Sequence, residues 1–164
     1  MRYASYVLLV LFTAATLLAA GPPADKSAMD KLKTLVGTWK GTDPHGDAVT
    51  VSYKLVSADN TLMEMLEMGE HKGGMVTMYC LDNGKVMMTH YCSMGNQPRM
   101  RLENSSGNTL SFAFVDGTNM KMPEDPHMHR LIVTMKDDNH FSQEWVMRAE
   151  GKETPSVFNF ERVK

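Results

Sequence analysis

The sequence predicts an all-β protein: a closed antiparallel up-and-down barrel of about ten strands, lipocalin-like in layout and preceded by one short helix. Two observations predict it. After Gly37, apolar and polar residues alternate along most of the chain, which is the period of a β-strand. Turn residues also interrupt the pattern about every 8 to 14 residues, so the connections suit antiparallel neighbours. A sheet of this many strands protects its edges best by closing on itself.

The chain begins with a pattern typical of a secretory signal peptide. Arg2 precedes a short apolar run, residues 7–20, and the run ends in the small residues Ala19, Ala20 and Gly21. The run is shorter than the roughly 20 apolar residues of a typical membrane-spanning helix, and no cysteine follows it to carry a lipid anchor. We therefore expect residues 1–21 to be a signal peptide and residues 22–164 to form one secreted or periplasmic domain.

Composition excludes one class of partner. The formal net charge is −2 and the sequence pI is about 6.3, so the chain lacks the basic character of a nucleic-acid-binding protein. No second hydrophobic segment indicates a membrane span, and the sequence leaves the oligomeric state open.

The expected elements follow in order. Residues 27–36 are expected to form one short helix, because Met29, Leu32, Leu35 and Val36 make an apolar stripe at helical spacing. Ser27 with Asp30 resembles a capping box at its start. Strands are expected near residues 36–42, 47–56, 61–69, 74–81, 85–92, 99–104, 109–116, 127–136, 140–149 and 156–163.

Asn83-Gly84 predicts a two-residue hairpin turn, which bears on the two cysteines. The turn pairs residue 82 with residue 85, so Cys80 and Cys92 lie about 17 Å apart along the ladder and on opposite faces. A disulfide needs Cα atoms within about 7 Å. We therefore expect free thiols, one of them available as a ligand.

The stretch LVGTWKG, residues 35–41, resembles the Gly-x-Trp signature of the lipocalin and calycin barrels. Together with HYC…GNQPRM, HMH, EW and the closing FNFERVK, it resembles a family of secreted lipocalin-like bacterial domains of unknown function. The resemblance implies that Trp39 closes the narrow end of a barrel. It implies no chemistry, because none is established for that family.

Histidines and long loops are predicted to gather at one rim of the barrel. In a meander, the loops after odd-numbered strands share one end, and these loops carry His45 and His71. His90 ends a strand at the same rim, and His127 begins another there, with His129 one pleat deeper. Because barrels bind ligands at their open mouths, we expect an exported protein that binds a small molecule.

Strand parity predicts which side chains enter the barrel. His127 and His129 share a face with Leu131, so both are expected inside, and His90 is expected inside with Cys92. The predicted ligand contacts are His90, Asn96, Gln97, Arg99, Phe112, Phe114, Leu131, Trp145 and Met147. Arg99 has an alternative role, an ion pair with Glu103 or Asp116, and residues 96–98 also suit a simple turn.

A metal site is a second hypothesis. Nitrogen and sulfur ligands for zinc or copper are offered by His90, Cys92, His127 and His129. Methionines near this rim favour copper, because thioethers are ligands for Cu(I). Methionine as an adaptable core filler is the alternative. A haem site is a weaker option, by resemblance of GTWKG to the nitrobindin barrels, with His127 or His129 as the axial ligand.

The sequence favours binding over catalysis. Cys92 with His90 or His127 could form a thiolate–imidazole pair, but no third orienting group is identifiable. The carboxylates are expected in turns or, for Glu64 and Glu144, on the outer face.

Overall fold

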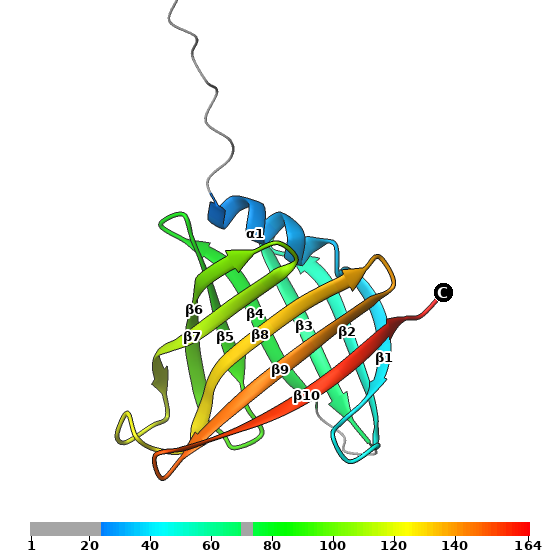
Figure 1. The fold of residues 1–164 in the computed structure, drawn as a ribbon. Helices are drawn as coiled ribbons and strands as arrows, with labels where there is room; N and C mark the ends of the chain where they lie inside the picture. The colour runs from blue at the N-terminus through cyan, green and yellow to red at the C-terminus, as the bar shows by residue number, and fades with distance from the viewer. Residues whose placement is uncertain (1–23, 70–73) are drawn as a thin grey trace, which may run out of the picture.

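The computed structural model describes residues 24–69 and 74–164, which form one closed barrel of ten antiparallel strands and a short helix (Figure 1). The fold class predicted from the sequence is confirmed. The elements are α1 Ala24–Lys33, β1 Gly37–Thr42, β2 Ala48–Val56, β3 Thr61–Met68, β4 Met75–Asp82, β5 Lys85–Tyr91, β6 Gln97–Ser106, β7 Thr109–Thr118, β8 His127–Asp137, β9 His140–Ala149 and β10 Lys152–Arg162. The predicted signal peptide and His71 lie outside the described residues.

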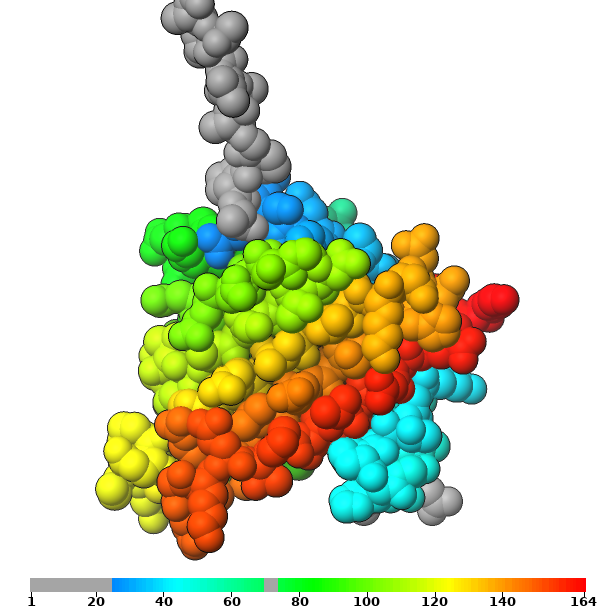
Figure 2. All heavy atoms as spheres, viewed as in Figure 1, coloured from blue at the N-terminus to red at the C-terminus, as the bar shows by residue number. Residues whose placement is uncertain are grey.

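Each strand pairs with the next along the chain, and β1 pairs with β10 to close the barrel. This up-and-down order places the β1–β2, β3–β4, β5–β6, β7–β8 and β9–β10 connections at one end, as predicted. In the space-filling view, the atoms of β6 to β10 form a continuous wall (Figure 2). A ligand that reaches the interior from this side must therefore pass through an end of the barrel.

Helix α1 covers the end that carries the short turns. Lys33 Nζ donates to the carbonyl of Asp59 at 2.8 Å, and Lys31 Nζ donates to the carbonyl of Gly107 at 2.7 Å. The helix begins three residues before the predicted start, and Asp25 in its first turn accepts a hydrogen bond from the backbone N–H of Val86 at 3.2 Å. Ser27 lies inside the helix, so the predicted capping box is wrong. In the described part of the chain, no helix has the length and apolar character needed to cross a membrane.

Trp39 closes the barrel at this end, as predicted. Its side chain is 1% exposed, and its Nε1–H donates to the carbonyl of Leu35 at 2.7 Å. The guanidinium of Arg162 lies 4.0 Å from the ring centroid, and Phe141 packs edge-on against the same ring from inside. One end of the barrel is thus filled by packed side chains.

The hairpin at Asn83-Gly84 has the predicted register. Asp82 faces Lys85, and Cys80 faces Met87. Cys80 and Cys92 are both free thiols, so the expectation of no disulfide between them is confirmed.

Candidate functional site

A cavity of about 290 Å³, here called the mouth pocket, opens at the end opposite α1. Its wall comes from β3, β4, β5, β8, β9 and β10 and from the β5–β6 loop. The lining is mostly apolar or sulfur-bearing and includes Trp145, Phe158, Cys92 and five methionines: Met68, Met75, Met94, Met128 and Met147. Among the described residues of this lining, His90 is the only nitrogen-bearing polar side chain apart from the indole of Trp145.

His90 is buried, with 2% of its surface exposed. It lies directly opposite Thr77 in the β4–β5 ladder, and Thr77 Oγ1 lies 2.9 Å from its Nδ1. The ring packs on Trp145, with centroids 4.5 Å apart. Nε2 is buried and has no hydrogen-bond partner among the residues that the structure describes. Burial lowers the pKa of His90 to about 4, so the imidazole is neutral near pH 7.

A row of inward-facing polar residues crosses four strands beneath the pocket. Tyr53 faces Glu64, Glu64 faces Thr77, and Thr77 faces His90 in successive ladders. The expectation that Glu64 lies on the outer face is wrong, because its side chain is 1% exposed inside the barrel. Leu62 and Leu66, two residues to either side on β3, are also buried, and their two-residue spacing was the sequence pattern that could have located Glu64.

Hydrogen bonds tie Glu64 to the opposite wall. Its Oε2 accepts from Tyr79 Oη at 2.7 Å and from Gln143 Nε2 at 3.0 Å, while Oε1 has no partner. Gln143 also bonds Tyr53 Oη at 2.7 Å and accepts from the indole N–H of Trp145 at 3.1 Å. Burial raises the pKa of the Glu64 carboxyl and exceeds the opposing effect of these hydrogen bonds. Burial, together with the adjacent carboxylate, also raises the pKa of Tyr53 and of Tyr79 well above the ordinary value.

The prediction that His127 and His129 enter the barrel is wrong, because a β-bulge interrupts β8. Met128 faces Met147, but the next pair along the ladder is Arg130 with Val146, so His129 is an extra residue. Strict alternation from Leu131 therefore fails at this point. Met128, and not a histidine, lines the mouth pocket next to Met147.

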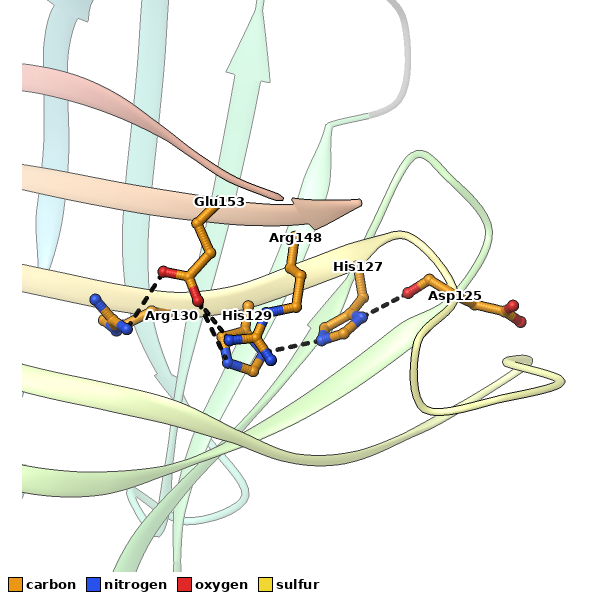
Figure 3. A network of polar contacts seen from close by, with 6 residues as sticks. All are labelled: Asp125, His127, His129, Arg130, Arg148 and Glu153. Carbon is orange, nitrogen blue, oxygen red and sulfur yellow. Dashed lines mark hydrogen bonds and ion pairs between the residues drawn. The ribbon is translucent and has the colours of Figure 1, made fainter. Parts of the chain in front are cut away.

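The two histidines lie in a separate polar network on the other side of β8 (Figure 3). The carbonyl of Asp125 accepts a hydrogen bond from His127 Nδ1 at 2.6 Å, and His127 Nε2 lies 3.0 Å from His129 Nδ1. Glu153 Oε1 is 3.9 Å from His129 Nε2 and also pairs with Arg148. Burial and then the charge of Arg148 lower the pKa of His129. Phe114, predicted as a wall of the ligand pocket, instead packs on His127 with centroids 4.1 Å apart.

The structure therefore does not bring the four predicted metal ligands together. His90 and Cys92 line the mouth pocket, whereas His127 and His129 line a different hollow with Arg148. Among residues 24–69 and 74–164, no group of three or more His, Cys, Asp or Glu side chains is arranged to hold a metal ion. The bulge also removes both histidines from the interior position that the haem alternative gave them.

Three other predicted ligand contacts hold the rim together instead. Arg99 is exposed and forms an ion pair with Asp116, which was the alternative role expected for it. Asn96 donates from Nδ2 to the carbonyl of Pro126 at 2.8 Å, and Gln97 donates from Nε2 to the carbonyl of Gly95 at 2.9 Å. None of the three lines the mouth pocket.

Of the predicted apolar ligand contacts, some line the mouth pocket and others lie deeper, in the core of the barrel. Trp145 and Met147 line the mouth pocket, as their parity predicts. Phe112 and Leu131 face inward but are fully buried in the core and do not line the pocket. A larger hollow, about 540 Å³, lies beside α1 at the closed end. Its lining includes Lys31, Asp137 and Arg162, which are tied to backbone or neighbouring side chains there, so it is a groove between structural contacts.

Comparison with known proteins identifies the fold and no family. No family model matches the sequence, and no curated protein matches it significantly. A crystal structure of a protein of unknown function from the DUF3598 family of Nostoc punctiforme matches 80% of this chain with a TM-score of 0.54 and 14% identity. This chain spans about half of that protein, 49% of its length, and at this identity the likeness shows a shared barrel fold alone. A structure named EF1p2_mFAP2b bound to DFHBI aligns over 82% of this chain and 98% of that one at 10% identity, with a TM-score of 0.39 that is too low to support a comparison.

Proposed function

We propose that this protein binds a small ligand in the mouth pocket, with His90 Nε2 as the polar contact at its inner end. The observation that carries the proposal is a buried imidazole nitrogen without a partner beside a cavity lined mostly by apolar and sulfur-bearing side chains. An unpaired buried polar atom costs roughly 1–3 kcal/mol, so a ligand that hydrogen-bonds or coordinates it recovers free energy.

The size and lining of the pocket support a small ligand. Its volume of about 290 Å³ is at the lower end of the roughly 300–1,000 Å³ typical of small-molecule sites. Methionine side chains are flexible and adapt to ligands of different shapes. The opposite end of the barrel is closed by Trp39 and α1, so we propose that the ligand enters only from the mouth.

The signal-peptide pattern of residues 1–21 supports a further part of the proposal, that the protein acts after export. A free thiol and several methionine sulfurs at the mouth would then face an extracytoplasmic environment. Export is tested by locating the full-length chain in cell fractions and by determining the N-terminal residue of the mature protein.

Naphthol is a suitable probe of the pocket, because its body is apolar and its hydroxyl can either donate to or accept from a neutral imidazole. We expect saturable binding, followed by the fluorescence of Trp145 in a Trp39→Phe variant. Ser156 lines the pocket, so Ser156→Phe should weaken binding at least about tenfold by filling the space. Ser142 on β9 has the opposite parity to Trp145 and Met147, so its side chain points outward. Ser142→Phe is therefore the matched control and should bind like the parent.

The role of His90 is tested on the hydrogen bond expected between its Nε2 and the hydroxyl of naphthol. Either the hydroxyl or the imidazole is removed. Naphthalene, which lacks the hydroxyl, should bind about 3- to 10-fold more weakly than naphthol, as expected for one hydrogen bond. His90→Phe should remove that difference. The proposal fails if Ser156→Phe and Ser142→Phe bind the probe equally, or if no saturable binding is seen.

A further inference from the structure

Sulfur atoms surround the mouth pocket on several sides. Met128 on β8 lies directly opposite Met147 on β9, so their side chains are cross-strand neighbours. On the other wall, the β4–β5 ladder ends at the pair Val76 and Tyr91. The residues just beyond that pair are Met75, the first residue of β4, and Cys92, which follows the end of β5. Both line the pocket, as do Met68 and Met94.

These methionines differ from those that fill the core. Met88 and Met100 are 1% and 0% exposed and are packed inside the barrel. The pocket methionines are half-buried or exposed, and Met94 has 42% of its surface exposed, so their thioethers border open space. Core filling does not explain sulfur side chains that line a cavity.

His90 supplies a nitrogen ligand at the inner end of the same pocket. Its Nδ1 is occupied by Thr77, which leaves the buried Nε2 as its free ligand atom. His90 lies near the end of β5 and Cys92 follows its last residue, Tyr91, and both side chains line the pocket. Two residues of extended chain span about 6.5–7 Å, a separation from which both side chains can reach one ion. Among the described residues, no carboxylate lines the pocket, and its side-chain oxygens are the hydroxyls of Ser93 and Ser156. The described lining therefore lacks the carboxylate ligands that hard cations such as Ca²⁺ or Mg²⁺ prefer.

We propose that the mouth pocket holds one soft monovalent metal ion, Cu(I), bound by His90 Nε2, Cys92 Sγ and at least one methionine thioether. Thiolate and thioether ligands select Cu(I) over harder ions, and imidazole suits copper. The inference rests on the proposed function, because it names the ligand of the same pocket. Binding is accompanied by loss of the Cys92 thiol proton to solvent, and copper stays Cu(I), so no electron is transferred.

The test is a titration of the mature protein with Cu(I), supplied anaerobically as its bicinchoninate complex with ascorbate. Loss of the complex's colour measures affinity, and native mass spectrometry measures stoichiometry. We expect one Cu(I) per chain. Cys92→Ser should weaken binding by more than the about 100-fold that loss of an outer-shell partner costs, and His90→Gln should also weaken it strongly.

Matched controls separate a built site from adventitious thiol binding. Cys80 is the second free thiol and lies on the outward side of β4, so Cys80→Ser should keep the parental affinity. The pair Met128→Leu/Met147→Leu should weaken binding at least about tenfold, whereas the outward pair Met63→Leu/Met65→Leu should not. Thermal melting confirms that each variant folds, and the methionine pair tests the site even if Cys92→Ser does not fold.

Each outcome decides between the proposals. Equal losses in Cys80→Ser and Cys92→Ser, or more than one weakly held Cu(I), overturn the metal site in favour of unspecific thiol binding. Naphthol binding without Cu(I) binding overturns the metal site and leaves the proposed small-ligand function standing. Failure to bind either probe overturns both.

Discussion

Gln143 on β9 donates a hydrogen bond from Nε2 to Oε2 of Glu64 on β3, with 3.0 Å between the two atoms. The two strands are not neighbours in the barrel, so this bond crosses the interior. Tyr53 and Tyr79 complete the cluster from β2 and β4. Trp145, which bonds Gln143, also lines the mouth pocket. The cluster therefore joins opposite walls directly beneath the site and fixes one wall of it.

Removing the Glu64 carboxyl should destabilise the fold. Glu64→Ala removes the acceptor of the buried Tyr79 hydroxyl and of one of the two hydrogen bonds that Gln143 Nε2 donates, and it creates a cavity. We expect a loss of about 2–5 kcal/mol in the free energy of unfolding. Glu67→Ala, on the exposed face of the same strand, is the control and should change it by less than about 0.5 kcal/mol. Urea unfolding measures both. Similar values for the two variants would contradict the cluster.

Stability should also depend on pH through Glu64. Burial raises the pKa of this carboxyl above its ordinary value of 4.5, so above pH 4.5 the folded chain keeps a proton that the unfolded chain releases. The free energy of unfolding should therefore fall as pH rises from 4.5 toward the pKa of the folded state. Glu64→Gln lacks this contribution. The difference in unfolding free energy between the parent and Glu64→Gln should shift against the parent as pH rises, and a difference independent of pH would refute the assignment.

Both cysteines should react as free thiols. In the hairpin register, Cys80 lies opposite Met87 and Cys92 follows the end of β5, so the chain cannot bring them together without breaking the β4–β5 ladder. A thiol-reactive chromogenic reagent added to the denatured, unreduced protein should report two thiols per chain. A reading of none would mean that the register of this hairpin is wrong.

Arg162 should be important for closing the barrel. Its guanidinium lies over Trp39 and donates to the carbonyls of Val36, Thr34 and Asp138, each at 2.9 Å. We expect Arg162→Ala to lower the free energy of unfolding by about 2–3 kcal/mol, because several carbonyls lose one shared donor. Arg162→Lys should restore little, since an ammonium lacks the planar fork of donors. Thermal or urea unfolding measures the series, and full rescue by lysine would contradict this role.

Much of the fold could be predicted from local patterns. The alternation along residues 131–135 and the Asn83-Gly84 turn specify a strand and a hairpin register without reference to distant residues, and the structure has both. Up-and-down order also follows from short connections alone. These features are local in sequence, which is why one sequence was enough to predict them.

The composition of the site could not be predicted from strand alternation, because it depends on two features that alternation does not reveal. One extra residue at His129 reverses the alternation near the start of β8, so Met128 lines the pocket in place of the predicted histidines. Glu64 is buried against its hydropathy because Tyr79 and Gln143, far away in the sequence, satisfy Oε2. A bulge and a cross-barrel hydrogen bond both depend on partners that no short stretch of sequence contains.

The most direct test of ligand binding in the mouth pocket is a methyl NMR titration. Protein labelled with ¹³C at the methionine methyls is titrated with naphthol, and the peaks are assigned by single Met→Leu variants. We predict shifts for Met68, Met75, Met94, Met128 and Met147, which line the pocket, and none for Met63, Met65 and Met78 on the outward side of β3 and β4. Shifts confined to the outward methionines, or no shifts at saturating probe, would contradict the account.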